Sequence, residues 1–343
     1  MTQDFDFDAV VVGAGAVGLA CGYALSQRGL IVAVLEAEHH IGQGVSSRNS
    51  EVIHGGLYYP TGSLKAQLCV QGRRLLYAFL DKHGVAYKRC GKLVVATSDD
   101  EIPRLDAIWD QALANDVEGM ERLSGAQAQA MEPGLNAHAA LLSPQSGVFA
   151  SHDYMLALQG EIEAAGGAVV LDTPFEGAEA LPGGGFTVRA GGADPTSLTC
   201  RLLITAPGLS SQEVASRIEG YPADHIPKAH YGKGVYFRLT GKAPFQRLIY
   251  PPPIHGALGT PTATTWAARR CSGRTWNMCP RPTIRSTRAG PTLSPPISAS
   301  SGRACPTARW FPTTPACDPS CMARMSRSLT SSCGAWRIMG SRG

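Results

Sequence analysis

The stretch that decides the fold is FDAVVVGAGAVGLACGYALSQRGLIVAVLE, residues 7–36. It opens on an apolar run suited to a buried parallel strand, and residues 30–35 form a second such run. Between the two runs, residues 16–28 predict a helix that ends at Gly29. A strand, a glycine turn, a helix and a second strand in this order predict a βαβ unit, and therefore an α/β fold with a Rossmann-like domain.

Three glycines in this unit have the spacing of a dinucleotide-binding turn. We expect Gly13 to allow the tight turn out of the strand, Gly15 to let a pyrophosphate approach the backbone, and Gly18 to let the helix pack closely. The helix would begin at Ala16 and Val17, whose backbone N–H groups would face the phosphates together with the positive end of the helix dipole.

Glu36 stands at the end of the second strand, 18 residues after Gly18. A carboxylate there can accept hydrogen bonds from a ribose diol and disfavours a 2′-phosphate. The motif therefore predicts an adenine dinucleotide, FAD or NAD, without separating the two. An ordinary glycine turn in an α/β domain is the alternative.

The loop after the second strand favours FAD. Residues 44–59, GVSSRNSEVIHGGLYY, are rich in small and polar side chains. Ser47, Asn49 and Ser50 would give the cofactor pyrophosphate a second set of hydrogen bonds, although turn chemistry alone also explains the serines. His54 and the two glycines after it bring a titratable ring and a close backbone approach to one place.

Several further motifs follow in order, and together they resemble one enzyme family. The segments are S-x-x-N-S-x-V-I-H-G-G-L-Y-Y at 46–59, SLKAQLCVQG at 63–72, CGKLVVA at 90–96, EIPRL at 101–105, SGVFASHDY at 146–154, EIEAAGGAVVL at 161–171, LLITAPGLSS at 202–211 and IPKAHYGKGVYFRL at 226–239. They resemble the L-2-hydroxyglutarate dehydrogenase/oxidase branch of the D-amino-acid-oxidase-type flavoenzymes. The resemblance covers about residues 7–259.

This resemblance implies oxidation of a 2-hydroxy acid to a 2-oxo acid, with FAD accepting the hydride. His54 is the first candidate for the base that takes the hydroxyl proton; alternatively, it only packs against the flavin. Tyr58 and Tyr59 would line the pocket or serve as core aromatics. Lys233 stands where related enzymes often carry Arg, which keeps the charge but loses the two-pronged grip on a carboxylate. Gly208 lies in the glycine turn that the resemblance places near the flavin.

The resemblance also implies two interleaved domains. We expect a discontinuous FAD-binding domain at 1–90 and 150–215, and a partial, incomplete α+β substrate domain at 91–149 and 216–259. Strands are expected at 92–97 and 233–239.

The first part of the expected FAD-binding domain contains a predicted amphipathic helix. Residues 64–83 predict this helix, with one apolar side made of Leu64, Leu68, Leu75, Leu76, Phe79 and Leu80.

The composition changes abruptly near residue 260. Earlier residues hold 19 Lys and Arg against 26 Asp and Glu, whereas residues 261–343 hold 12 Arg and one acid, Asp318. A basic nucleic-acid arm is one interpretation, but such arms usually contain Lys and few Cys or Trp. A metal site at Cys317 and Cys321 is another, although no matching pair accompanies this loose spacing. We therefore expect no nucleic-acid partner and no metal.

A shifted reading frame explains residues 260–343 better. If each codon of residues 271–287 began one base earlier, codons consistent with CSGRTWNMCPRPTIRST would give Val-Phe-Gly-Pro-Asp-Val-Glu and continue with further acids. Trp276 and Met278 have single codons, so much of this shifted sequence is forced. It is similar to the F-G-P-D-x-E stretch of the same enzyme family. We expect a non-native, disordered tail, poor folding and little or no activity.

The same residues also allow different functions. The chain could be an amine or glycerol-3-phosphate oxidoreductase on the same scaffold, or a non-catalytic product of the shifted frame. An NAD-linked dehydrogenase would need a set of catalytic residues placed beside the nicotinamide ring, and the sequence shows no such set.

No apolar run reaches the length of a transmembrane segment, and the acidic start is unlike a signal peptide, so we expect a cytoplasmic protein. An electron acceptor must reoxidise the flavin, whether oxygen, a quinone or an electron-transfer protein.

Overall fold

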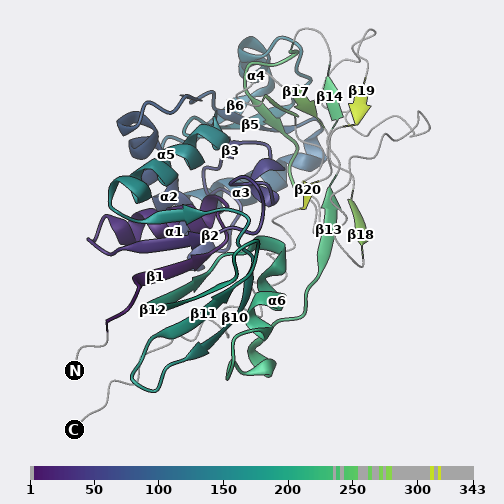
Figure 1. The fold of residues 1–343 in the computed structure, drawn as a ribbon. Coiled ribbons are helices and arrows are strands. Elements are labelled where there is room, and N and C mark those ends of the chain that lie inside the picture. Colours follow the sequence, from purple (N-terminus) through teal and green to yellow (C-terminus); the bar gives the residue numbers. More distant parts are fainter. Residues whose placement is uncertain are drawn as a thin grey trace.

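The computed structural model describes residues 4–234, 237–239 and 243–253, together with short strands farther along the chain. Two larger sheets, each with helices packed against it, dominate this part (Figure 1). The described helices include none with the length and apolar character that a bilayer crossing requires.

The first sheet contains the βαβ unit that residues 7–36 predict. Its order is β10-β11-β12-β1-β2-β9. The neighbours from β12 through β1 and β2 to β9 run parallel, and β10, β11 and β12 form an antiparallel meander. The strands are β1 (Phe7–Val12), β2 (Val32–Leu35), β9 (Ala168–Val170), β10 (Phe175–Ala180), β11 (Phe186–Ala190) and β12 (Thr196–Thr205).

Apolar side chains cover both faces of this sheet, as a buried parallel sheet requires. Alternate residues of β1 belong to different clusters: Ala9 and Val11 pack with α1 (Ala16–Ser26) and α5 (Ser151–Ala164), whereas Val10 and Val12 pack with the meander. The short helix α6 (Ser211–Ser216) contributes Val214 to the second of these clusters. The carboxyl ends of β1, β2 and β12 therefore meet at one edge.

The second sheet has the order β19-β14-β17-β16-β15-β5-β7-β6. Its strands are β5 (Lys92–Ala96), β6 (Glu121–Ser124), β7 (Ala139–Ser143), β14 (Phe237–Leu239), β15 (Leu248–Tyr250), β16 (Thr262–Thr264), β17 (Arg270–Ser272) and β19 (Trp310–Pro312). Helix α3 (Ile102–Ala114) packs on the face that carries Val94, and α4 (Gly125–Met131) packs on the face that carries Leu93.

Two three-stranded sheets complete the described fold. The first has the order β3-β8-β4, and the second has the order β18-β13-β20. Their strands are β3 (Val52–Ile53), β4 (Tyr87–Lys88), β8 (Gly147–Phe149), β13 (Tyr231–Gly234), β18 (Trp276–Cys279) and β20 (Ala316–Cys317). Where the sequence predicts one strand over 233–239, the chain instead forms β13 and β14, which belong to different sheets. Apart from the strands named here, residues 254–343, with their predicted disorder, lie outside the described residues.

Helix α2 (Leu64–Lys82) corrects one prediction. Its buried residues are Ala66, Val70, Arg73, Tyr77 and Leu80, at the alternating spacing of four and three expected for a packed helix. Leu64, Leu68 and Leu75 are more than half exposed, so this half of the predicted apolar side was wrong, whereas Leu76, Phe79 and Leu80 pack in the core as predicted. Hydrophobicity alone misplaced part of the buried side because the helix buries Arg73, whose guanidinium pairs with Glu118.

One buried carboxylate fastens β15 to the rest of the second sheet. Glu132 follows α4, is 2% exposed, and accepts hydrogen bonds from the backbone N–H groups of Gln246 and Arg247 at 2.9–3.1 Å. The Arg247 guanidinium lies 3.3 Å from the same carboxylate. Two segments more than a hundred residues apart in sequence are thereby joined.

Replacing Glu132 by alanine is expected to lower the free energy of unfolding by about 3 kcal/mol, because it leaves buried donors and a partly buried cation without their acceptor. Urea unfolding measures the change. Arg122→Ala is the matched control, since its pair with Asp106 is about half exposed on both sides and contributes about 1 kcal/mol or less. Equal effects of the two substitutions would contradict this role of Glu132.

Candidate functional site

The glycine turn between β1 and α1 is shaped to receive a phosphate group. Gly13 has a φ of +100°, and a Cβ there would lie 2.7 Å from the backbone oxygen of Ala206. At Gly18, a Cβ would overlap the carbonyl oxygen of Gly13, so the helix begins in direct contact with the turn. Only glycine fits these two positions without moving the backbone.

Gly15 and the start of α1 leave room for a ligand. Gly15 is the N-cap residue, and it has no side chain to cap the helix. The first turn of the helix carries no acid, and Val17 within it is 69% exposed. The Ala16 N–H donates to the Ser46 hydroxyl at 2.9 Å. A helix N-terminus with exposed surface and no competing negative charge suits an anion.

Glu36 is tied to the glycine turn itself. One of its carboxylate oxygens accepts a hydrogen bond from the Ala14 N–H at 2.7 Å, and the other accepts from the Glu38 N–H at 3.1 Å. The side chain is thereby oriented at the carboxyl end of β2, beside the turn. The sequence predicts Glu36 as a ribose acceptor but does not reveal the hydrogen bond from the Ala14 N–H, which holds the turn in place.

The loop from η1 (Val45–Ser47) onward approaches the turn through Ser46, which the sequence interpretation missed. The side chains of Ser47 and Asn49 form hydrogen bonds within their own loop. The Ser47 hydroxyl donates to the Gln43 and Gly44 carbonyls. The Asn49 amide donates to the Ser46 carbonyl and accepts from the Glu51 N–H. Ser50 is half-buried in the same loop. A serine-rich sequence cannot show which of its hydroxyls turns inward.

Gly208 lies near the glycine turn, after the end of β12. It opens the turn η3 (Gly208–Ser210) after β12 and has a φ of +61°, and a Cβ added to it would meet no atom within 4 Å. Its neighbours Ala206 and Pro207 contact Gly13. The predicted cofactor residues of β1, β2 and β12 thus gather at the carboxyl edge of the parallel strands, where open α/β sheets bind their ligands.

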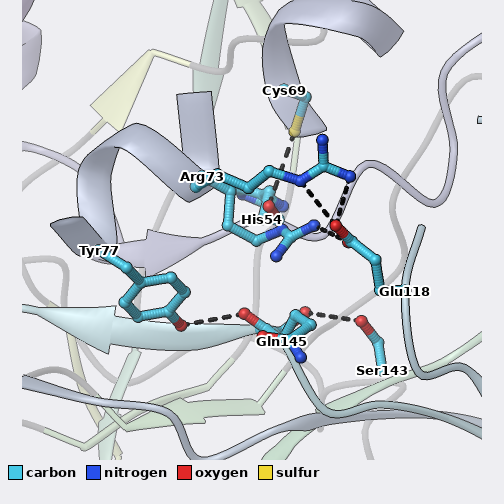
Figure 2. A network of polar contacts seen from close by, with 9 residues as sticks. His54, Cys69, Arg73, Tyr77, Glu118, Ser143 and Gln145 are labelled. Carbon is cyan, nitrogen blue, oxygen red and sulfur yellow. Dashed lines mark hydrogen bonds and ion pairs between the residues drawn. The ribbon is translucent and has the colours of Figure 1, made fainter. Parts of the chain in front are cut away.

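His54 and Tyr58 lie on the connection between β3 and α2. Cys69 on α2 donates to the His54 carbonyl oxygen with a sulfur–oxygen distance of 3.7 Å (Figure 2). Asn115 donates to the carbonyls of Gly56 at 3.2 Å and Tyr59 at 2.7 Å. These contacts fix the backbone of this segment, residues 54–59, which we call the His54–Tyr59 loop.

The Tyr58 hydroxyl is buried, and no other described residue hydrogen-bonds to it. Burial raises the pKa of Tyr58 far above its usual range, so the side chain stays protonated. It can donate a hydrogen bond, but it is a weaker acid than an exposed tyrosine and cannot act as a base near neutral pH. The Lys233 backbone pairs with Asn277 and Cys317, and its side chain lies outside what the structure describes.

Replacing Asn115 by alanine is expected to lower the free energy of unfolding by about 2 kcal/mol and to loosen the His54–Tyr59 loop, because one buried and one partly buried carbonyl lose the hydrogen bond from Asn115. Urea unfolding combined with limited proteolysis measures both effects. A variant with unchanged stability and no new cleavage in this loop would show that Asn115 does not hold it.

Comparison with known proteins identifies the family of this chain. Residues 8–295 match the DAO family, described as FAD dependent oxidoreductase. The chain belongs to this family. FAD is the family's cofactor, and the glycine turn, the exposed start of α1 and the oriented Glu36 fit its adenosine diphosphate part.

Among the relatives of this DAO-family chain are L-2-hydroxyglutarate dehydrogenases that are named as mitochondrial. The Arabidopsis thaliana protein is 39% identical over 291 residues, which covers 74% of this chain and 58% of the relative. The Homo sapiens protein is 31% identical over 275 residues, covering 74% and 59%. The chain therefore spans less than two thirds of the length of these curated relatives.

Solved structures agree on the fold. L-alpha-glycerophosphate oxidase from Mycoplasma pneumoniae, with FAD bound, superposes with a TM-score of 0.72 at 22% identity, covering 79% of this chain and 72% of that one. Glycine oxidase from Geobacillus kaustophilus gives 0.73 at 18% identity, covering 92% and 83%. At these identities the likeness establishes the architecture alone, which includes the Rossmann-like domain predicted from residues 7–36.

Proposed function

We propose that this chain oxidises a 2-hydroxy acid similar to L-2-hydroxyglutarate to the corresponding 2-oxo acid, using FAD. The observation that carries the proposal is the 39% identity with an L-2-hydroxyglutarate dehydrogenase over 74% of this chain. The family match at residues 8–295 includes both the glycine turn and the His54–Tyr59 loop. The chemistry that FAD supplies when bound is acceptance of the hydride from the substrate carbon. The protein must then bind the acid, orient its C2–H bond and accept the hydroxyl proton.

The pyrophosphate would be held by the backbone of Gly13, Gly15, Ala16, Val17 and Gly18. This assignment is supported by the shape of the turn and by the exposed start of α1.

The rest of the cofactor would be held from three further segments. Glu36 would accept hydrogen bonds from the ribose. Ser47, Asn49 and Ser50 would line the loop beside the phosphates, with Ser46 nearest to the turn. Gly208 would allow close approach after β12.

For the proton transfer we assign His54 as the base, because an imidazole accepts a proton near neutral pH and the backbone of this residue is fixed by α2. Tyr58 would line the pocket and remain protonated. Lys233 would attract a substrate carboxylate by charge, more loosely than an arginine.

We also propose the domain division and the shifted frame. The FAD domain would comprise 1–90 and 150–215, the substrate domain 91–149 and 216–259, and residues 260–343 would be non-native. Turnover by the 343-residue chain would then be weak. Independent reads of the gene around Gly259–Thr262 test this: a single uninterrupted frame through the region would rule the shift out.

We propose a small-molecule acid and an electron acceptor as partners, and a cytoplasmic location. The relatives, by contrast, are named as mitochondrial. Fractionation of the native cells, with a compartment marker for each fraction, tests the location.

The activity is tested by reconstituting the purified chain with FAD and following flavin bleaching under anaerobic conditions. The 343-residue chain and a frame-restored chain are compared with L-2-hydroxyglutarate, its D-enantiomer, glycine and glycerol 3-phosphate. We expect the L-hydroxy acid to bleach the flavin fastest. Faster bleaching by glycine or glycerol 3-phosphate would instead establish an amine or glycerol-3-phosphate oxidoreductase, and a bound flavin that no substrate bleaches would indicate a non-catalytic product.

A further inference from the structure

Lys92, the first residue of β5, is buried in an unusual way. Its side chain is 0% exposed, and its ammonium group has no hydrogen-bond partner among the described residues. Two aromatic rings face the ammonium: its nitrogen lies 4.3 Å from the centre of the Tyr250 ring and 5.5 Å from that of Tyr58. Cation–π contacts of this kind stabilise a buried charge but do not replace hydrogen bonds.

Phenol and thiol groups from four segments of the described chain lie beside Lys92. They are Tyr58 from the His54–Tyr59 loop, Cys69 from α2, Cys90 from the segment before β5, and Tyr250 from β15. Burial raises the pKa of both thiols. No described carboxylate forms a salt bridge with Lys92. Burial lowers the pKa of Lys92 to about 8, so most of the amine is still charged at pH 7.

The Lys92 ammonium lies next to the His54–Tyr59 loop. Lys92 pairs with Ser143 across β5 and β7, and the Ser143 hydroxyl would lie 2.8 Å from a Cβ on Gly55. Cys69, which interacts electrostatically with Lys92, donates to the His54 carbonyl on the other side (Figure 2). Lys92 and the segment assigned to the flavin site therefore share two neighbours, Ser143 and Cys69.

A purely structural residue at this position would be apolar. Burying an ammonium without a partner costs folding energy, and a packed hydrophobic side chain of similar volume avoids that cost. A poorly solvated charge also acts more strongly on its surroundings than an exposed one, because little water screens it.

We propose that the buried positive charge of Lys92 raises the reduction potential of the flavin bound beside the His54–Tyr59 loop. A cation held close by in a region of low dielectric constant stabilises the redox form with more negative charge, which is the reduced form. This inference rests on the proposed function, because it takes the loop to be part of the flavin site.

The test is a spectroelectrochemical titration of the full 343-residue chain loaded with FAD, comparing wild type with Lys92→Met, Lys92→Arg and Lys65→Met. Lys65 is the matched control, since its ammonium also lies over a tyrosine ring, 4.5 Å from the centre of Tyr59, but the residue is partly exposed. We expect a lower potential for Lys92→Met with the same FAD content, and unchanged potentials for Lys92→Arg and Lys65→Met. The difference between wild type and Lys92→Met should shrink as the pH rises from 7 to about 10, because the lysine loses its proton.

Equal potentials for wild type and Lys92→Met, or a difference that does not change with pH, would overturn the inference and leave the proposed function standing. A wild-type chain that is folded, as measured by circular dichroism, and still takes up no FAD would overturn both. Should Lys92→Arg not fit the buried site, the pH dependence of the wild-type and Lys92→Met pair still decides the question.

Discussion

Valine in place of Gly15 is expected to weaken FAD binding by roughly 100-fold or more while leaving the protein folded. The backbone at Gly15 is extended, with a φ of −77° and a ψ of 175°, which a β-branched residue adopts without strain. A Cβ there meets only the Ser46 hydroxyl at 3.1 Å. Its bulk instead occupies the surface where a pyrophosphate must approach the helix N-terminus.

Fluorescence titration with FAD measures the affinity, and circular dichroism measures the fold. Two further variants bracket the effect. Gly18→Ala should lose folded structure, because its Cβ would overlap the Gly13 carbonyl, whereas Gly72→Ala on α2 has no atom nearby and should change neither property. An unchanged FAD affinity in a folded Gly15→Val protein would show that the cofactor does not bind at the turn between β1 and α1.

The second large effect concerns stability. Lys92→Met is expected to raise the free energy of unfolding at pH 7 by about 3 kcal/mol, because a pKa lowered from 10.5 to about 8 means that folding disfavours the charged amine. Between these two pH values the unfolded chain binds more protons than the folded chain. Stability of the wild type therefore rises with pH through this window, and the advantage of the methionine variant is largest below pH 8 and smallest above pH 10.5.

Urea unfolding at pH 7 and again above pH 10.5 measures the difference. A methionine variant that is less stable than wild type at pH 7 would mean that the ammonium group contributes to folding. The outcome bears on function, because a residue that costs stability and is nevertheless present needs another reason to be there.

The sequence predicts the first sheet well because its signals are local. The apolar runs around the glycine turn, the turn glycines and Glu36 all lie within residues 7–36, and the observed β1, α1 and β2 follow them closely. Steric restrictions at Gly13 and Gly18 depend on backbone geometry that the spacing of the motif already implies.

Features that depend on contacts distant in sequence were not predictable. Ser46 rather than Ser47 faces the glycine turn, which only the path of the loop decides. The buried side of α2 follows Arg73 and its partner Glu118, 45 residues away. Lys92 resembles an ordinary strand residue with an exposed side chain until Tyr58 and Tyr250 are placed around it.

The central claim is that FAD rests where β1 passes to α1. It is tested most directly by the amount of flavin bound per chain after reconstitution of the frame-restored protein and removal of free cofactor. We predict a yellow protein with about one FAD per chain, and a nearly colourless Gly15→Val variant that is equally well folded. A folded, colourless parent protein, or a variant that retains as much flavin as its parent, would contradict it.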